Sequence, residues 1–451
     1  MERGERTGRK RWFRRAVLRW GAVAGVGGLG GLGGCSLFDG PSSDEPSVTP
    51  APLNAETEPT GTVDTSTPTD RSDSPSNAEA TEREPTVTHE STDTAGAWPV
   101  VQGDDAHTGW RPGADAPDSP VAAAWSVDVG GDVQGSVTLT DGHVFVGSAD
   151  GLVTALDASD GAQRWTFEAD GEVRATPTVA DGLVYCGDES GALTALDAER
   201  GTEQWRFPAT SDREGPTAVR AGPAVTGERA YVGATDGRVY AVETVDGTER
   251  WSFDAGGFLG VVTPVAVALG RVYAGSYAGR LFAIDADDGR EDWRYEGRDE
   301  TQTWSGPTVA GGVVYAGASP GGVFAVDALQ GNELWHVPTD ESVFSSPAVT
   351  DEAVYVGTDG GQVLALDAAD GSERWRAEVG SAVKSSPAVV DGAVSAGTTG
   401  GAVLALDGTD GTERWRFAPG GGVTSSPAIV DGRLFVGTDS GRVVALGGSE
   451  R

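Results

Sequence analysis

Short hydrophobic runs recur along residues 133–446, and each ends at a polar turn. A clear example is the run Val363 to Leu366, which is followed by the turn residues Asp367 to Gly371. A run of about four residues bounded by Asp and Gly is typical of a buried strand that enters a tight hairpin. The Asp side chain can bond the amides of its own turn, and the Gly can adopt the left-handed conformation.

The same phrase, Ala-x-Asp-x-x-x-Gly-x-x-x-Trp, occurs seven times. The copies are Ala155–Trp165, Ala195–Trp205, Ala241–Trp251, Ala283–Trp293, Ala325–Trp335, Ala365–Trp375 and Ala405–Trp415, and Glu243 replaces the Asp in one of them. Before each copy come a Pro-containing strand, a turn, a Val-Tyr-Val-Gly-like strand and a Gly turn. Each unit therefore predicts four short strands, and its Trp is large enough to wedge against a neighbouring sheet.

The tryptophan spacing predicts the architecture. The docking tryptophans are Trp125, Trp165, Trp205, Trp251, Trp293, Trp335, Trp375 and Trp415, between 40 and 46 residues apart. Four strands in this period indicate the blade of a β-propeller. The last unit stops at Leu446 without a Trp strand, whereas Trp125 lies on a strand with no phrase before it. We therefore expect an all-β, eight-bladed propeller that closes when the first strand completes the last blade, which also removes exposed sheet edges.

The repeated phrase resembles the tryptophan-docking repeat of the pyrroloquinoline quinone (PQQ) propeller family, over roughly residues 121–446. The resemblance implies an eight-bladed propeller. That family includes quinoprotein dehydrogenases and also the non-enzymatic propeller lipoprotein of the outer-membrane β-barrel assembly machinery. One fold of this kind hosts many activities, so the resemblance leaves function open.

The N-terminal residues are expected to direct export. Residues 1–34 combine a basic start, Arg14-Arg15-Ala16-Val17-Leu18-Arg19 and a short Gly-rich apolar stretch, which resembles a twin-arginine signal. Leu32 to Cys35 resembles a lipobox, so we expect cleavage before Cys35 and lipidation of its thiol. The alternative is an uncleaved signal anchor. Together these features predict a lipid-anchored protein at the extracellular face of the cytoplasmic membrane.

Two further segments precede the propeller. Residues 35–96 are rich in Ser, Thr, Pro, Asp and Glu, and such a segment cannot bury enough apolar surface to offset ordering, which predicts a disordered tether that O-glycosylation can modify. Residues 97–120 form a distinct preamble, in which we expect Trp98 and Trp110 to pack on the propeller. His107 is expected to have a structural hydrogen-bonding role rather than a metal-binding or catalytic one.

The chain is strongly acidic, with a formal net charge of −35. Residues 1–34 carry eight Arg or Lys and two Asp or Glu, so their removal takes the formal charge from −35 to −41. Lys10 and Lys384 are the two lysines. This composition resembles that of halophilic archaeal proteins, and at molar salt a Debye length of about 3 Å limits self-repulsion. An acidic mesophilic surface protein is the alternative, and nucleic acid is excluded as a partner because phosphate binding needs basic surface.

One variable column singles out a candidate ligand site. It stands three residues before the first-strand Pro, whose place Val137 takes in the first unit, and reads Gln134, Arg174, Arg220, Val261, Trp304, Phe344, Lys384 and Thr424. The first strand of a blade lines the central channel, so this column is expected at the channel mouth. Its cations and aromatics suit an anionic or aromatic ligand. The alternative is that the cations pair with carboxylates in the adjacent turns, such as Asp150, Asp188, Glu189, Asp236, Asp359 and Asp439.

Other chemistry is sparsely represented. Cys186 falls in a small apolar core column, so no intramolecular disulfide is expected. Asp285 to Gly289 has the wrong spacing for a calcium loop, and no metal site or catalytic Ser-His-Asp set is predicted. His143 and His336 are expected at the surface.

We therefore expect a monomeric, non-catalytic binding or scaffold module at the cell surface, with an unidentified protein or small ligand as partner. A surface receptor for carbohydrate or peptide is not distinguishable from it. The specific role in outer-membrane assembly would need an outer membrane, which an archaeal halophile lacks. The alternative function is a PQQ- and calcium-dependent dehydrogenase. This chain lacks the vicinal Cys-Cys pair and the long insertions that the resemblance to those enzymes would imply.

Overall fold

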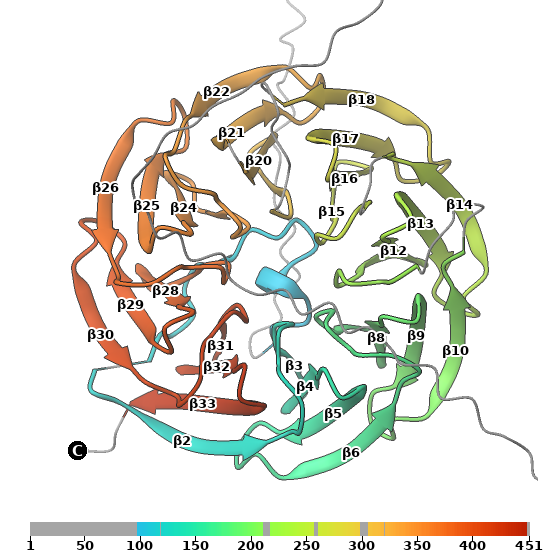
Figure 1. Cartoon of the computed structure of the whole chain (residues 1–451), viewed down its shortest axis with the longest axis horizontal. Coiled ribbons are helices and arrows are strands. Elements are labelled where there is room, and N and C mark those ends of the chain that lie inside the picture. The colour runs from blue at the N-terminus through green and yellow to red at the C-terminus, as the bar shows by residue number, and fades with distance from the viewer. Residues whose placement is uncertain are drawn as a thin grey trace, which may run out of the picture. The chain divides into compact units, whose positions relative to one another are not determined.

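The computed structural model describes residues 97–117, 119–210, 217–256, 260–297, 305–319 and 321–448. Eight four-stranded antiparallel sheets stand as blades around a common axis, with the first strand of each blade innermost (Figure 1). This confirms the all-β, eight-bladed fold. The expected export signal in residues 1–34 and the tether in residues 35–96 lie outside the described residues. Within the described ranges, no helix is both long and apolar enough to cross a membrane.

Blades 1 to 4 follow one another in sequence. Blade 1 contains β3 (Thr138–Thr140), β4 (His143–Gly147), β5 (Leu152–Asp157) and β6 (Gln163–Glu168); blade 2 contains β7 (Thr178–Ala180), β8 (Leu183–Gly187), β9 (Ala192–Asp197) and β10 (Glu203–Pro208); blade 3 contains β11 (Ala224–Thr226), β12 (Arg229–Gly233), β13 (Arg238–Glu243) and β14 (Glu249–Asp254); and blade 4 contains β15 (Ala266–Ala268), β16 (Arg271–Ser276), β17 (Arg280–Asp285) and β18 (Glu291–Glu296).

Blades 5 to 8 complete the ring. Blade 5 contains β19 (Thr308–Ala310), β20 (Val313–Ala318), β21 (Gly322–Asp327) and β22 (Glu333–Val337); blade 6 contains β23 (Ala348–Val349), β24 (Ala353–Gly357), β25 (Gln362–Asp367) and β26 (Glu373–Glu378); blade 7 contains β27 (Ala388–Val390), β28 (Ala393–Gly397), β29 (Val403–Asp407) and β30 (Glu413–Phe417); and blade 8 contains β31 (Ala428–Val430), β32 (Arg433–Gly437), β33 (Arg442–Gly448) and β2 (Val121–Asp128).

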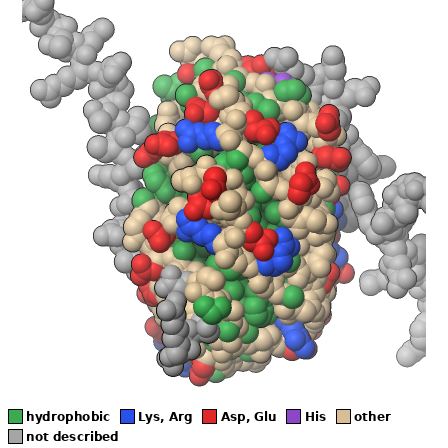
Figure 2. Space-filling model, turned by 90° about the vertical axis from the view of Figure 1, so that its left-hand side faces the viewer, with side chains coloured by type: hydrophobic (Ala, Val, Ile, Leu, Met, Phe, Trp, Pro, Cys, Tyr) green, Lys and Arg blue, Asp and Glu red, His purple; other side chains and the backbone are tan. Residues whose placement is uncertain are grey.

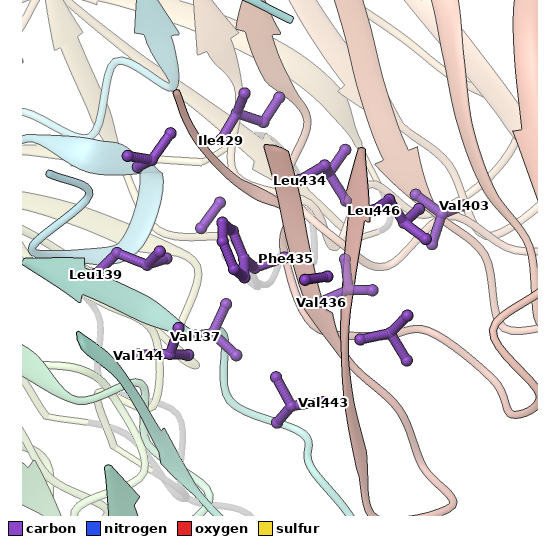
Figure 3. Packing of buried hydrophobic residues seen from close by; sticks show 14 of the residues in the cluster. Val137, Leu139, Val144, Val403, Ile429, Leu434, Phe435, Val436, Val443 and Leu446 are labelled. Atoms are coloured by element: carbon purple, nitrogen blue, oxygen red, sulfur yellow. The ribbon is translucent and has the colours of Figure 1, made fainter. Parts of the chain in front are cut away.

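The ring closes as the sequence predicts. Strand β2 pairs antiparallel with β33, in a register that runs from Val121 opposite Gly448 to Asp128 opposite Arg442. Behind this pairing, side chains of the first and last blades share one hydrophobic core, in which Val137, Leu139 and Val144 of blade 1 face Phe435 and Val436 of blade 8 (Figure 3). Burial of this surface holds the first and last blades together.

Seven of the eight docking tryptophans join their blade to the next one by a hydrogen bond. The indole Nε1 of Trp335 donates a hydrogen bond to the carbonyl of Ala368 in the following blade, and equivalent bonds start from Trp125, Trp165, Trp205, Trp251, Trp293 and Trp375, with lengths of 2.7–3.1 Å. The Gly of the following phrase must be Gly because a Cβ there would lie 2.5–2.8 Å from the indole. The phrase is therefore a joint between blades as well as a turn.

The preamble crosses the axis of the ring. It contains the short 3₁₀ helix η1 (Val101–Gly103), which lies at the centre in Figure 1, and the strand β1 (Trp110–Arg111), which pairs parallel with β27. The backbone of the preamble, from Trp98 to Gly109, hydrogen-bonds the first strands of six blades. The bonded residues in blades 1, 2, 4, 5, 6 and 7 are Leu139, Val179, Val267, Val309, Val349 and Val389. The preamble thus supplies partners for amides that face the axis, which buried backbone groups require.

Candidate functional site

The two faces of the propeller have different chemistry. We call the face that carries the start of each first strand and the turn between the second and third strands the mouth face. The opposite face, which carries the turns after the first and third strands and so all the docking phrases, is the docking face. Gln134, Arg174, Arg220, Phe344 and Lys384 all lie on the mouth face, as the sequence predicts from strand direction.

Three members of the predicted column belong to one group of hydrogen bonds and ion pairs. Arg220 donates two hydrogen bonds, of 2.7 and 2.9 Å, to the carboxylate of Glu189. Arg174 donates to Glu172 at 2.6 and 2.9 Å and to Gln134 Oε1 at 2.5 Å, and its Nε lies 3.8 Å from Glu189. Bonding to Glu189 raises the pKa of Arg220, so this guanidinium stays charged.

Lys384 lies on the other side of the mouth, in blade 7. Its Nζ is 3.8 Å from Asp359 Oδ1 and 5.3 Å from the centre of the Phe344 ring, over which it stands. The aromatic ring and the cation of neighbouring blades thus form a cation–π pair. The side chains of Arg174, Arg220 and Lys384 are 33, 44 and 45% exposed, so each reaches solvent although each has a carboxylate beside it.

In blade 4 the structure places another residue at the column position than the repeat spacing predicts. Trp304, the column residue of blade 5, lies outside the described residues. Val261 is fully buried and packs on Gly233, as Val173 packs on Gly147 in blade 1. The half-buried Val262 therefore holds the column position. The column is defined by its distance from the Pro of each blade. Strand pairing shows that blade 4 carries its Pro, Pro264, one position earlier than the other blades, so the count from this Pro gives Val261 instead of Val262.

Beneath the column, hydroxyl side chains link the innermost strands. The amides of Ser136, Ser346, Ser386 and Ser426 donate to the hydroxyls of Thr176, Ser386, Ser426 and Ser136, each in the next blade around the ring. Gly222, Pro264 and Gly306 interrupt this series in blades 3 to 5. The sequence showed the small and hydroxyl character of these positions but not this bonding.

Deeper on the axis lie two buried polar side chains of the preamble that sequence reasoning did not connect with the mouth. Gln102 Nε2 donates to the carbonyl of Pro347 at 2.9 Å, and His107 bonds the backbone of Pro307. Burial lowers the pKa of His107 to about 4, so the imidazole is neutral at pH 7. Their other polar atoms, Gln102 Oε1 and His107 Nδ1, are buried without a partner. A run of polar residues without hydrophobic periodicity, from Gln102 to Thr108, was the available signal.

The adjacent carboxylates of the preamble are also perturbed. Burial raises the pKa of Asp105 to about 6, and the neighbouring Asp104 adds to that rise. Burial also raises the pKa of Asp104, against the hydrogen bonds that it accepts from Thr108. Such shifts accompany functional sites and structural networks alike. Here the bonds to Thr108 hold the turn that carries His107 to the axis.

A pocket of about 530 Å³ lies on the docking face, where blade 8 meets blade 1. Its lining includes Leu139, His143, Asp157, Arg164 and Arg433, and Asp157 pairs with Arg164. In blades 3 to 6 a Tyr stands at the place of Phe435 and bonds the next blade, as Tyr273 bonds Ala328. Phe435 has no hydroxyl, which leaves room at this seam, far from the column on the mouth face.

The remaining candidates have structural surroundings. Cys186 is buried in the core as a free thiol, which confirms its assignment as an apolar core residue. His143 is half-buried in the pocket lining, and half-buried His336 bonds the carbonyl of Gly321 at 2.6 Å. In the part of the chain that the structure describes, no group of three or more His, Cys, Asp or Glu side chains could hold a metal ion.

These features define the class of protein: an eight-bladed propeller whose blades are joined by tryptophan docking and closed by the N-terminal strand. A model of the family described as outer membrane protein assembly factor BamB matches residues 121–218, 210–343 and 323–450. The chain belongs to that family. No curated protein matches the chain.

Solved structures confirm the fold. BamB from Moraxella catarrhalis is 19% identical, with a TM-score of 0.62, and the match covers 74% of this chain and 99% of that one. The quinohemoprotein alcohol dehydrogenase from Comamonas testosteroni is 16% identical, with a TM-score of 0.68 and coverage of 80 and 82%. A europium-containing methanol dehydrogenase is 14% identical, with a TM-score of 0.67 and coverage of 78 and 98%. The fold is thus shared by a BamB protein and by alcohol-oxidising enzymes.

Proposed function

We propose that the protein is an exported, lipid-anchored propeller that acts as a non-catalytic binding or scaffold module at the extracellular face of the cytoplasmic membrane. The observation that carries the proposal is that the chain's own preamble occupies the axis. Bonds from the preamble to six of the eight first strands hold the blades in one arrangement. A rigid ring with solvated faces suits the presentation of binding surfaces.

Anchoring is the first part of the proposal to test. Full-length protein and a Cys35→Ala variant would be expressed in a host with twin-arginine export and lipoprotein processing, and the cells would be fractionated. We expect the unaltered protein in the membrane fraction with a lipid-modified N-terminus, and the variant to be released or retained unprocessed. An unmodified N-terminus in the unaltered protein would contradict the anchor.

The mouth column is the proposed ligand site, formed by Gln134, Arg174, Arg220, Trp304, Phe344 and Lys384. Support comes from the partial exposure of its three cations and from the Lys384–Phe344 pair, which together suit an anionic or aromatic small molecule. Replacing Arg174, Arg220 and Lys384 with Gln should abolish thermal shifts that a panel of carboxylates and phosphates produces on the unaltered protein. Shifts that persist in the triple variant would move the site elsewhere.

A PQQ-dependent dehydrogenase is the second candidate, favoured by the shared fold of the quinohemoprotein alcohol dehydrogenase. Purified protein would be incubated with PQQ and calcium, and then assayed by absorbance and by dye-linked alcohol oxidation. We expect that PQQ absorbance does not remain with the protein after free cofactor is removed. We also expect dye reduction no faster than with PQQ and calcium without protein. Turnover that depends on the protein would overturn the non-catalytic proposal. Under that proposal the protein works as a monomer with a protein or small-molecule partner and does not bind nucleic acid.

A further inference from the structure

The large hydrophobic side chains that are exposed in the described residues all lie in three consecutive blades. They are Val245 in blade 3, Leu269 in blade 4, and Leu329 and Leu334 in blade 5, with exposed fractions of 83, 40, 56 and 52%. Val245 and Leu329 stand in docking turns, and Leu269 in the turn after a first strand. Leu334 is the second residue of the outer strand β22, beside that same face. We call these four residues the apolar arc.

The turn after the first strand shows that this sector differs from the rest of the docking face. In blades 1, 2, 6, 7 and 8 the turn presents an exposed aspartate, namely Asp141, Asp181, Asp351, Asp391 and Asp431. Blades 3, 4 and 5 have Gly227, Leu269 and Gly311 at the same place. Blade 3 keeps an exposed carboxylate in this turn, Glu228, so the acidic collar of the docking face is interrupted over blades 4 and 5.

At the second position of the outer strand, blades 3 and 4 keep the charged residues Arg250 and Asp292, and blade 5 differs from both. Blades 6 and 7 place Arg374 and Arg414 at the start of β26 and β30, each paired with the aspartate of its own docking turn at 2.9 Å. Acidic and basic side chains alternate over the rim that these strands form (Figure 2). Blade 5 has Leu334 at this position of its outer strand. Charged side chains protect an exposed sheet edge from association, and Leu334 leaves this edge without that protection.

Register brings part of the arc together across two blades. Between blades 3 and 4, Arg229 pairs with Asp287 of the next docking turn at 2.7 Å. One blade further, the equivalent residues are Arg271 and Leu329. With no carboxylate there, Arg271 instead pairs with Asp292 and donates to the carbonyl of Leu269. Arg271 thus bonds the Leu269 carbonyl, and Leu329 holds the docking-turn position that Asp287 holds next to Arg229.

We propose that the apolar arc is the docking surface for a partner protein that presents apolar side chains flanked by Lys or Arg. Large apolar side chains that are exposed in one sector of a surface mark an interaction site when they form a patch. The basic flank follows from carboxylates beside and within the arc. Asp246 is exposed, Asp287, in the docking turn between those of Val245 and Leu329, is 88% exposed, and Glu352 is 80% exposed. Opposite charges at the rim of an interface select the partner and fix its register.

The same carboxylates disfavour two other occupants. A second copy of this chain, docked through the same surface, would bring like charges face to face. A membrane surface with anionic headgroups would be repelled by the acidic border. The inference rests on the proposed binding role and adds to it the face and the chemistry of the partner.

Photo-crosslinking in cells that make the protein tests this docking surface. The full-length chain would carry a photoreactive amino acid at Leu329 or, as the matched control, at Thr409, which holds the same place in the docking turn of blade 7. We expect one discrete adduct from position 329, at least about fivefold stronger than from position 409. Its partner would be identified and purified, and its affinity for the full-length chain measured.

The affinity measurement decides the proposal. Replacing Leu269 and Leu329 with Asp should weaken binding of the purified partner at least about tenfold, while Thr409→Asp should leave binding unchanged. Both variants should keep the thermal unfolding midpoint, since the side chains are exposed. The docking surface would be overturned by adducts that consist of two copies of this chain or of lipid alone. It would equally be overturned by equal adducts at both positions, by no adduct, or by an unchanged affinity. The anchoring and oxidation assays are independent of these outcomes.

Discussion

Two regions hold the blades of this propeller together, and they do so in opposite ways. On the docking face, seven equivalent joints repeat one contact, in which an indole donates to a carbonyl of the next blade over a glycine. On the axis, one preamble segment makes a series of different contacts with six blades. The joints are redundant, so the loss of one leaves six intact. The preamble occurs once, so a single change there affects several blades.

The preamble should therefore be the more sensitive region. Trp98 is 2% exposed and its backbone exchanges two hydrogen bonds with Leu139. We expect Trp98→Ala to lower the free energy of unfolding by about 3–5 kcal/mol, because a buried Trp leaves a large cavity. Chemical denaturation would measure this change. Trp110→Ala, at a half-buried position of the same segment, is the control, and equal losses for the two variants would contradict a central role for Trp98.

Acid should destabilise the folded protein through protonation of His107 at the axis. Because burial lowers its folded-state pKa to about 4 from 6.5, the unfolded chain binds the proton first as the pH falls. The stabilisation that neutral His107 contributes to the folded state is fully present above pH 6.5 and is lost as the pH falls toward 4. The difference in unfolding free energy between the unaltered protein and His107→Gln should fall by about 3 kcal/mol over that window. A constant difference would show that His107 does not titrate this way.

Using the variant as reference removes the opposite effect of Asp105. Its folded-state pKa is raised to about 6, so protonation below that pH favours the folded state. This contribution is present in both proteins and cancels in the difference. Asp105→Asn should in turn remove the gain in stability between pH 6 and 4, which denaturation at several pH values would detect.

A single docking joint can be tested through its glycine. Gly331 has φ of 73°, and a Cβ would lie 2.7 Å from Trp293, whereas Gly182 has φ of 75° with no atom within 4 Å of its Cβ position. Gly182→Ala should cost about 1–2 kcal/mol for the left-handed backbone alone. Gly331→Ala should cost about 2 kcal/mol more, because the indole must move. Equal losses in denaturation would mean that the close approach of Trp293 is unimportant.

The smallest effect concerns one hydrogen bond. Trp375 Nε1 donates to Gly408 of the next blade at 2.9 Å, while Trp415 of blade 7 has no acceptor among the described residues, since blade 8 has no docking phrase. Trp375→Phe should therefore cost about 1 kcal/mol more than Trp415→Phe. Thermal and chemical unfolding of the pair would give the difference. A larger loss at Trp415 would indicate that packing, not the bond, dominates the joint.

Much of the fold could be predicted because it depends on local, repeated signals. The Asp and Gly of each phrase act within their own turn, and Trp125 without a phrase revealed the closing strand. Val261 shows where local reasoning failed, since one shifted Pro moved the column by a position. The partners of the mouth cations were only partly foreseen: Glu189 and Asp359 were expected in the turns, but Glu172 was not.

The sequence by itself determined the blade, the number of blades and the strand that closes them, because strand period, turn chemistry and tryptophan spacing are local properties that repeat. Tertiary structure alone decided the path of the preamble across the axis and the pairing of Arg229 with Asp287 between neighbouring blades. Those contacts join residues far apart in the chain, and no periodicity encodes them. They arise only when closure of the ring brings the first strands around one axis and sets neighbouring turns side by side.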